Sequence, residues 1–332
     1  MRILRSVPAA ADVPVALTIG NFDGVHIGHQ AMLSRLRDAA REEALPACAL
    51  TFEPHPREFF APDQAPARLT SLREKLELLA GEGLARTHVC RFDYRLAQIT
   101  ADDFIERVLV RGLGVRRLLV GDDFRFGARR AGDFGLLKAR AAALGYTVEA
   151  MSSVTLDGER VSSTAVRKAL ETGDLTRAGR LLGRPYSISG RVVRGDGLGR
   201  QLGYPTANIR IEHNRPPLTG IFAVEVSGAV DAAGSAALPL RGVASLGIRP
   251  TVKQQGQPVL EVYVLDFSGD LYGRHVRVDF LHKFRDEEKF ADLAALTRQI
   301  ALDVANTRAY FEESDALRQK DGVSGRAGAH RC

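Results

Sequence analysis

Segments of strand-like and helix-like sequence alternate over the first ~150 residues of the chain. Apolar runs with β-branched members predict five strands, at 15–19, 47–52, 87–92, 118–120 and 146–151. Apolar residues at helical spacing predict helices between them, at 30–43, 72–80, 100–109 and 133–144. Strands that alternate with helices form a parallel sheet covered on both faces. We therefore predict a doubly wound α/β fold for this half.

The sequence changes character near residue 183. Two short helices, predicted at 164–172 and 174–182, close the first half, and Gly183-Arg184-Pro185 resembles a linker. Strand-like runs separated by turn residues then predict a small antiparallel barrel, at 187–193, 222–226, 241–245, 261–267 and 275–281. A last helix is predicted at about 286–311, followed by a polar, disordered tail. The predicted domains are 1–183 and 184–313, with the tail at 314–332.

The composition excludes several classes of protein. The chain of 332 residues is long enough for two domains. It contains no run of about 18 apolar residues, so we expect no membrane span. Its N-terminus lacks the long apolar region of a secretory signal. The three cysteines, Cys48, Cys90 and Cys332, lie far apart, which favours a reducing cytoplasm over a disulfide framework. A net charge of +6 suits nucleic acid or phosphorylated small molecules. Because the basic residues form no block, we expect no nucleic-acid partner. The oligomeric state is not predicted.

Unusual polar and glycine-rich motifs follow four of the predicted strands. They are Gly20–Gly24, Glu53–Pro56, Gly121–Gly127 and Arg160–Arg167. In open parallel sheets, ligands bind beyond the carboxyl ends of the strands. The four motifs therefore predict one ligand site at that edge of the sheet.

His26 and His29 stand three residues apart at a predicted helix start. This spacing places both rings on one side of the first turn. Free backbone N–H groups and the helix dipole attract phosphate there, and imidazoles can donate hydrogen bonds as charge builds in a transition state. Two exposed histidines on a capped helix are the alternative. The nearby glycines and the position after a strand favour phosphate binding.

Other polar residues of the first half allow two interpretations each. Asp123 contacts adenosine or a metal, or instead closes an Asx turn before Phe124. Arg125 and Arg129 contact phosphate or are solvated, and solvation is favoured for Arg129. His55 lies between two prolines in an extended loop, with either a structural role or a flavin or nucleotide contact.

A second motif-rich region lies at 195–208. Its glycines suit a flap whose backbone covers phosphates. Thr206 and Asn208 are two residues apart, so on a strand they face the same way. A hydroxyl and an amide oxygen pointing together can help to hold Mg²⁺. A turn or a surface pair is the alternative for this isolated pattern.

The first-half motifs resemble a known enzyme family. Gly20–His29 resembles the His-x-Gly-His signature of adenylyl- and cytidylyltransferases, and Ser162-Ser163-Thr164 with Arg167 resembles their second signature. With Phe52–Pro56 and Gly121–Gly127, the similarity narrows to bacterial bifunctional riboflavin kinase/FAD synthetase. The resemblance implies a Rossmann-like nucleotidyltransferase domain in which His26, His29 and Arg167 are catalytic. Nucleotide or phosphate contacts are then expected from Gly20, Phe22, Asp23, Gly24, Gly28, Asp123, Ser163 and Thr164.

The second-half motifs resemble the riboflavin kinase module of the same family. The matching motifs are Pro205–Asn208, Gly220–Ala223, Gly247–Thr251 and Tyr272-Gly273. The resemblance implies that Glu261 is the catalytic carboxylate, although the local alternation also permits an outward strand residue. It further implies metal ligands at Thr206 and Asn208, nucleotide contacts at Gly195, Gly197 and Gly203, and a substrate contact at Arg285. In the first half, a substrate contact is expected at His55. Two positions depart from the family pattern: Ser245 replaces an asparagine and Tyr263 a histidine.

The resemblance implies two reactions, from riboflavin to FMN and from FMN to FAD, each with ATP, and it implies Mg²⁺ as cofactor. There are three alternatives. The first is a kinase with a decayed adenylylation site, and the second is a regulator that binds flavin or nucleic acid without turnover. The third is a nucleotidyltransferase for another phosphorylated substrate. The intact His26, Thr206 and Glu261 count against the first two. No role is assigned to His88, His213, His275 or His282.

Overall fold

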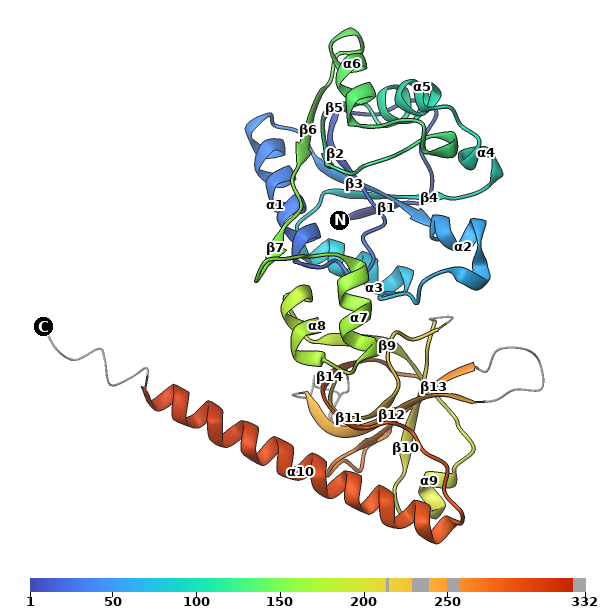
Figure 1. Ribbon diagram of the computed structural model, residues 1–332, viewed down its shortest axis with the longest axis vertical. Coiled ribbons are helices and arrows are strands. Elements are labelled where there is room, and N and C mark those ends of the chain that lie inside the picture. The colour runs from blue at the N-terminus through green and yellow to red at the C-terminus, as the bar shows by residue number, and fades with distance from the viewer. Residues whose placement is uncertain (213–214, 229–238, 250–256, 325–332) are drawn as a thin grey trace, which may run out of the picture. The chain divides into compact units, whose positions relative to one another are not determined.

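The computed structural model describes residues 1–212, 215–228, 239–249 and 257–324. His213, Pro250 and Thr251, which the sequence analysis named, lie outside the described residues. Contacts divide the chain into two compact units (Figure 1). The first comprises Met1–Arg167 with Leu181–Gly183, and the second comprises Lys168–Arg180 with Arg184–Cys332. Much of the two short helices expected in the first domain therefore belongs to the second unit.

The first unit contains a six-stranded sheet in which every neighbouring pair is parallel. Its spatial order is β1-β4-β3-β2-β5-β6. The strands are β1 (Arg2–Leu4), β2 (Val15–Ile19), β3 (Ala47–Glu53), β4 (Arg86–Arg91), β5 (Val115–Gly121) and β6 (Thr147–Met151). The edge strand β1 was not predicted, because three residues are too few to show an apolar pattern.

Helices cover both faces of this sheet (Figure 1). The helical segments are α1 (Ile27–Glu42), α2 (Pro56–Phe60), η1 (Pro62–Gln64), α3 (Leu72–Gly81), α4 (Tyr94–Ala97), α5 (Ala101–Asp103), η2 (Phe104–Gly112), η3 (Ala128–Arg130) and α6 (Phe134–Leu144). A hairpin of β7 (Thr155–Leu156) and β8 (Glu159–Arg160) follows, and then α7 (Ser163–Glu171) and α8 (Leu175–Leu182).

Two buried clusters show that strand side chains pack on both faces of the sheet. Leu17 and Leu50 pack with Ile105 on one face, whereas the adjacent Ala16 and Ala49 pack with Leu36 on the other. Successive strand side chains point to opposite faces, so strands buried on both sides need apolar residues throughout. All five residues of β2 are buried. The predicted doubly wound parallel sheet is confirmed.

Capping side chains set several helix ends of the first unit. Thr100 accepts a hydrogen bond from the Asp103 N–H at 3.0 Å, and Asp133 accepts one from the Leu136 N–H at 3.0 Å. Gly145 ends α6 with φ at 72°, a left-handed conformation that glycine adopts without a side-chain clash. These caps are local in sequence, which explains why the sequence predicted these helices closely.

The second unit is a closed antiparallel barrel in the order β10-β13-β12-β11-β14-β9. Its strands are β9 (Tyr186–Val193), β10 (Thr206–Arg210), β11 (Gly220–Ser227), β12 (Leu240–Arg249), β13 (Gln257–Val264) and β14 (His275–Arg285). Ile209, Leu260 and Leu246 align across three strands, and all three are buried in its interior. The predicted barrel is confirmed, with β10 as an additional strand beside the five expected. A short helix, α9 (Leu198–Gln201), interrupts the glycine-rich segment.

The terminal helix differs from the expectation at both ends. It was predicted at about 286–311, but α10 begins at Leu293 and ends at Ser324, so part of the tail expected to be disordered (314–332) is helical. Asp292 caps its start by accepting from the Ala295 N–H at 2.7 Å. Asp315 accepts two hydrogen bonds from Arg241 of β12, at 2.8 and 2.5 Å, which ties this polar stretch to the barrel. Residues 325–332 lie outside the described part.

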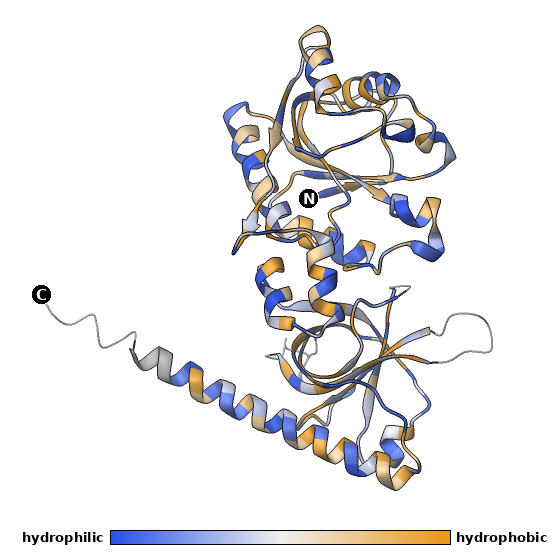
Figure 2. Cartoon of the chain, in the orientation of Figure 1, coloured by the Kyte–Doolittle hydropathy of each residue, from blue (hydrophilic) through white to orange (hydrophobic). Residues whose placement is uncertain are grey.

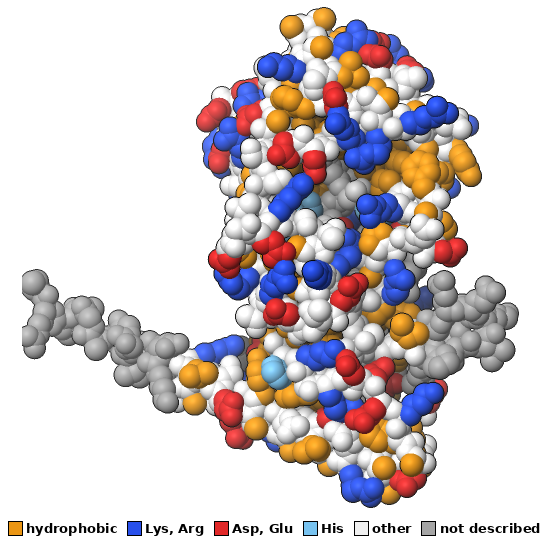
Figure 3. Space-filling view, in the orientation of Figure 1, with side chains coloured by type: hydrophobic (Ala, Val, Ile, Leu, Met, Phe, Trp, Pro, Cys, Tyr) orange, Lys and Arg blue, Asp and Glu red, His pale blue; other side chains and the backbone are white. Residues whose placement is uncertain are grey.

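The apolar and charged residues are distributed over the helices and the surface as follows. Among the described residues, no helix combines the length and the apolar character needed to cross a bilayer. Hydrophobic and hydrophilic bands alternate along α10 (Figure 2), as expected of a helix with one face against a barrel. Acidic and basic side chains are interspersed on the face drawn in Figure 3.

We expect Phe311 to anchor α10 on the barrel. Its ring is buried among Ala223 and Leu265, and the Arg241 guanidinium lies 4.7 Å from the ring centroid. Phe311→Ala should lower the free energy of unfolding by about 3 kcal/mol, because truncation of a buried ring loses packing and leaves a cavity. Leu302→Ala is the matched control, since Leu302 is half exposed on the same helix. Urea unfolding of the full chain measures both, and equal effects would contradict this packing.

Candidate functional sites

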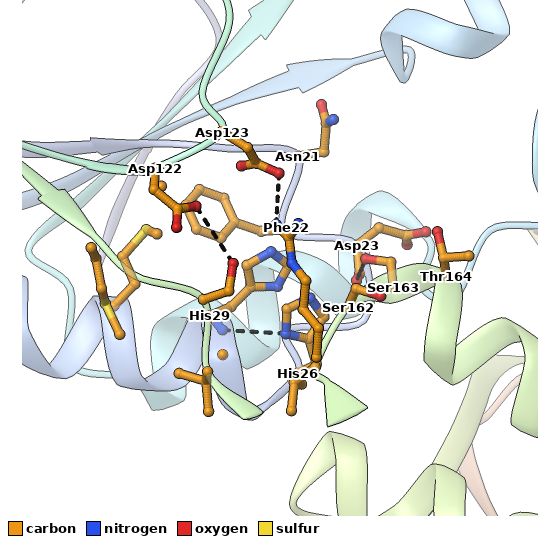
Figure 4. A pocket seen from close by; sticks show the side chains of 18 of the residues that line it. Asn21, Phe22, Asp23, His26, His29, Asp122, Asp123, Ser162, Ser163 and Thr164 are labelled. Carbon is orange, nitrogen blue, oxygen red and sulfur yellow. Dashed lines mark hydrogen bonds and ion pairs between the residues drawn. The ribbon is translucent and has the colours of Figure 1, made fainter. Parts of the chain in front are cut away.

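A cavity of about 410 Å³ opens in the first unit, beyond the carboxyl ends of β2, β3, β5 and β6. All four motifs that the sequence placed at strand ends contribute to its lining. Figure 4 shows the two imidazoles of His26 and His29 together, with Ser162, Ser163 and Thr164 on one side and Asp122 on the other. The prediction that the strand-end motifs meet at one edge of the sheet is therefore confirmed.

The loop between β2 and α1 is held by its aspartate. Asp23 is buried, and its carboxylate accepts hydrogen bonds from the Leu69 N–H at 3.1 Å and from the Thr70 N–H and hydroxyl at 3.0 and 3.1 Å. The same carboxylate forms an ion pair with Arg167 of α7. Asp23 thus joins the loop after β2, the segment before α3 and the first turns of α7.

Backbone conformation in this loop is unusual. Phe22 and Val25 have φ values of 48° and 39°, and Gly24 has φ at 82°. Non-glycine residues at positive φ carry strain that surrounding contacts must offset, and such strain is frequent at ligand sites. Here the buried Phe22 ring fills the core and contacts His29 edge-on, with ring centroids 5.2 Å apart.

His26 and His29 lie on one side of the first turn of α1, as expected. His26 caps the helix, because its Nδ1 accepts from the His29 N–H at 3.3 Å. The two rings stack with centroids 3.7 Å apart and planes 15° apart. Burial lowers the pKa of His29 well below its usual range, and the neighbouring His26 and Lys75 lower it further. His29 is therefore neutral near pH 7, and a neutral imidazole still offers one N–H donor.

His55 has a structural contact and lines the same cavity. Its Nδ1 accepts from the Arg57 N–H at 3.1 Å, and its own N–H donates to Glu58 at 3.2 Å, which caps α2. Arg68 binds Glu58 and also donates to both oxygens of Glu53, at 2.6 and 3.1 Å. His55 therefore has a structural role as the cap of α2, and its place in the cavity lining also allows a flavin or nucleotide contact.

The serine-rich segment begins α7 at the cavity. The Ser162 hydroxyl accepts from the Ala165 N–H at 3.2 Å, and the Ser163 hydroxyl donates to the Asp23 carbonyl at 2.9 Å. Thr164 is exposed and lines the cavity. Arg167 donates to the Ala67 carbonyl at 2.5 Å in addition to its ion pair with Asp23. Hydroxyls at a helix start beside a guanidinium form a site suited to phosphate.

The charged residues of the loop after β5 lie partly inside and partly outside the cavity lining. Asp123 accepts from Arg160 of β8 at 2.6 Å, and both side chains are more than half exposed. Arg125 forms an ion pair with Asp133 at 2.8 Å, outside the cavity lining. Arg130 lines the cavity where Arg129 does not. Sequence reasoning missed Arg160 and Arg130 as lining residues, although Arg160 opens the motif that it singled out.

A second cavity, of about 340 Å³, lies in the second unit between one side of the barrel and α10. Asn208, Glu261 and Ser245 are aligned across β10, β13 and β12. Their neighbours Leu260 and Val262 are buried inside the barrel, so this row points outward into the cavity. The Thr206 hydroxyl lies 3.5 Å from a Glu261 oxygen. Glu261 is therefore an outward strand residue that also lines a cavity.

The glycine-rich segment packs closely against this row. A side chain at Gly195 would collide with the Asn208 amide, so a larger residue there would require the Asn208 side chain to move. Gly197 has φ at 74°, begins α9 and lines the cavity. Gly203 has φ at 87° and belongs to the turn that leads into β10.

Arg285 links the end of β14 to α10. It donates to both oxygens of the buried Asp303, at 3.0 and 2.6 Å, and to Glu288 at 3.1 Å. Its guanidinium also lines the cavity. Ser245, one of the two departures from the family pattern, donates to Glu287 at 2.8 Å, a residue that sequence reasoning missed. Nothing local in the sequence marks Glu287, because its partner lies on a strand far away in the chain.

The cavities contain most of the residues named from the sequence. Four glycines are exceptions: Gly20, Gly24, Gly195 and Gly203 are absent from the linings. Tyr263, the second departure from the family pattern, lines the second cavity. Further lining residues of the second cavity that were not predicted individually are Asp196, Leu198, Gly199, Leu202, Tyr204, Ile221, Val243, Ala244, Glu288, Phe290, Leu296, Ile300 and Asp303.

Comparison with known proteins agrees with the two sites. A sequence model described as FAD synthetase matches residues 9–165, and one described as riboflavin kinase matches residues 182–311. The chain is 51% identical to the bifunctional riboflavin kinase/FMN adenylyltransferase of Pseudomonas fluorescens, over 88% of this chain and 91% of that protein. It is 47% identical to the protein of the same name from Escherichia coli K12, over 94% and 98% of the two chains.

A solved structure has the same fold. The crystal structure entitled macrolide-efflux protein, from Streptococcus pneumoniae, matches with a TM-score of 0.77 at 27% identity, over 93% of this chain and 99% of that one. The sequence models cover most of the chain, and the curated relatives align over nearly their full length. The chain belongs to the family of bifunctional riboflavin kinase/FMN adenylyltransferases.

Proposed function

We propose that this chain phosphorylates riboflavin to FMN in its second unit and adenylylates FMN to FAD in its first unit, with ATP as co-substrate in both reactions. The observation that carries this proposal is the presence of two separate cavities with different chemistry. One holds a histidine pair beside a hydroxyl-rich helix start, and the other holds a carboxylate beside a hydroxyl and an amide.

In the adenylylation, a phosphate oxygen of FMN attacks the α-phosphorus of ATP, and pyrophosphate leaves. The reaction needs positioning and stabilisation of negative charge rather than an enzyme nucleophile. The His26 and His29 rings supply N–H donors as charge builds on the α-phosphate. Ser163, Thr164 and Arg167 are the groups that we assign to the departing pyrophosphate, because they gather at the start of α7.

In the phosphorylation, the 5′-hydroxyl of riboflavin attacks the γ-phosphorus of ATP, and ADP leaves. Glu261 is suited to accept the hydroxyl proton, since its carboxylate points into the cavity beside Thr206. The apolar residues Phe290, Leu296 and Ile300 line the α10 side of the cavity, which suits a flat aromatic ring. We therefore assign the flavin to that side and the phosphates to the Thr206 side.

The donor groups of the second cavity fit Mg²⁺. Thr206 and Asn208 each offer an oxygen atom, the ligand type that this cation prefers, and nucleotide phosphates and waters can complete its coordination. Bound Mg²⁺ would neutralise charge on the ATP phosphates. No group of three His, Cys, Asp or Glu side chains able to hold a metal occurs in the part of the chain that the structure describes, so the proposal rests on hydroxyl and amide donors.

Incubation of the purified chain with riboflavin, ATP and Mg²⁺ tests the two activities together. Chromatography of the flavins over time should show FMN first and FAD afterwards, because FMN is the substrate of the second reaction. Omission of ATP is the control and should leave riboflavin unchanged. FMN that accumulates without any FAD would contradict the adenylylation.

Single substitutions should separate the two reactions. Glu261→Gln removes the proton acceptor and keeps the size, so FMN formation should fall by roughly 10²- to 10⁴-fold while supplied FMN is still converted to FAD. His29→Ala should do the reverse, with a loss on the order of 10²-fold in FAD formation, because a donor to the transition state is removed. Each variant is the control for the other. Equal damage to both steps by either substitution would refute separate sites.

A further inference from the structure

The Ser245 hydroxyl faces the second cavity, and the proposed reaction gives it no role. Its strand neighbours Ala244 and Leu246 are fully buried in the barrel, so Ser245 stands on the outward side of β12. The hydroxyl donates to the Glu287 carboxylate at 2.8 Å. Because an ionised carboxylate only accepts, the single hydroxyl hydrogen of Ser245 is committed to Glu287, and the oxygen lone pairs remain for another group.

Glu287 reaches Ser245 from the connection between β14 and α10. The start of this connection is held against α10, because Arg285 donates to both oxygens of Asp303, at 3.0 and 2.6 Å. A side chain at Gly247 would overlap the Glu287 carboxylate, so that carboxylate lies directly on the backbone of β12. Both Ser245 and Glu287 line the second cavity. The hydroxyl and the carboxylate therefore form one built unit of its wall.

Ser245 lies between the two ends of the cavity to which the parts of the substrate are assigned. Glu261 is its cross-strand partner on β13, and side chains paired in this way are about 5 Å apart. Thr206, where the phosphates are assigned, is on β10, and β13 separates β10 from β12. On the other side, α10 packs on β12 and β11 and contributes Leu296 to the lining. A chain that joins a reacting hydroxyl at Glu261 to a ring beside α10 therefore passes Ser245.

The ribityl chain of riboflavin has the chemistry to match this wall. It carries secondary hydroxyls on its 2′, 3′ and 4′ carbons, between the ring and the reacting 5′-hydroxyl, and each of them can donate a hydrogen bond. The protein groups along its path are acceptors, namely the carboxylates of Glu261 and Glu287 and the lone pairs of Ser245. Donors of the substrate thus meet acceptors of the protein.

We propose that Ser245, with its hydroxyl held by Glu287, accepts a hydrogen bond from a secondary hydroxyl of the ribityl chain and so makes the second cavity selective for a flavin with an intact polyol side chain. The inference rests on the proposed riboflavin kinase activity. Ser245 contacts the substrate, and Glu287 is a positioning residue that fixes the direction of the hydroxyl. When the substrate lacks that hydroxyl, an acceptor of the protein is left unmatched, and this is the physical basis of the selectivity.

A purely structural role for the bond between Ser245 and Glu287 has a different consequence. If the bond only held the connection against β12, its loss would impair the reaction of every flavin by the same factor. If Ser245 recognises a hydroxyl, its loss acts only on flavins that carry that hydroxyl. Ratios of rates between substrates separate the two cases, because a general change of the site cancels in such ratios.

Phosphorylation of hydroxyl-deleted flavins tests the inference. The full chain is supplied with ATP, Mg²⁺ and either riboflavin or an analogue that lacks the 2′-, 3′- or 4′-hydroxyl, and kcat/KM is measured for each. In the wild type, one analogue should react roughly tenfold less efficiently than riboflavin, because one hydrogen bond is lost. In Ser245→Ala, the same analogue and riboflavin should differ by less than about twofold, since neither finds the acceptor. In Glu287→Ala, the difference should shrink to roughly threefold, because the hydroxyl remains but is no longer held.

Asp286→Ala is the matched control for Glu287→Ala. Asp286 belongs to the same connection, is exposed and pairs with Lys283 at 2.6 Å, and it does not line the cavity. Its loss removes the same charge and should leave every ratio at the wild-type value. Ratios in Ser245→Ala that equal those of the wild type for all analogues would overturn the inference, as would a wild type that phosphorylates every analogue as well as riboflavin. Unchanged ratios in Glu287→Ala would overturn the role of Glu287.

Binding measurements keep the inference separate from the proposed activity. A wild-type chain that forms no FMN would refute the proposed function. Dissociation constants of riboflavin and the analogues, obtained from quenching of flavin fluorescence, would then still decide the role of Ser245, with the same ratios expected. Ser245 lines the second cavity and not the first, so the difference between the wild type and Ser245→Ala reports on the second cavity.

Discussion

The carboxylate of Asp23 is the interaction on which the adenylylation site depends. It receives the backbone N–H groups of Leu69 and Thr70 and the guanidinium of Arg167, and so joins three segments that lie far apart in the sequence. The histidine loop, the start of α3 and the start of α7 therefore keep a fixed spacing around one cavity. A buried carboxylate is stable only when donors satisfy it fully, and here both backbone and side-chain donors do so. Preorganisation of this kind keeps donors aimed at a reacting phosphate.

The second unit positions its groups by strand register instead. Asn208, Glu261 and Ser245 face the same cavity because antiparallel pairing sets them opposite one another on three strands. A shift by one residue would turn Glu261 into the barrel interior and bring Leu260 outward. Gly195 packs closely on Asn208 of this row, and the bonds of Arg285 to Asp303 tie β14 to α10.

Sequence reasoning reached the fold and many of the polar lining residues because their signals are local. Apolar periodicity marked the strands, and the His26–His29 pair and the Thr206–Asn208 pair lie within single elements. What it missed depends on contacts between distant segments. The sequence did not show that the Asp23 carboxylate binds protein groups, and neither Arg160 nor Glu287 shows its partner in the sequence. The helical extension to Ser324 was missed because a polar stretch resembles a disordered tail until Arg241 binds Asp315.

The central claim is that two different phosphorus atoms of ATP react at two separate sites. Tracing of radioactive phosphorus from ATP into the flavins tests it most directly, with riboflavin as the starting flavin. The account predicts that label from the γ-position appears in both FMN and FAD, whereas label from the α-position appears in FAD alone. Label from the α-position in FMN, or its absence from FAD, would contradict the account.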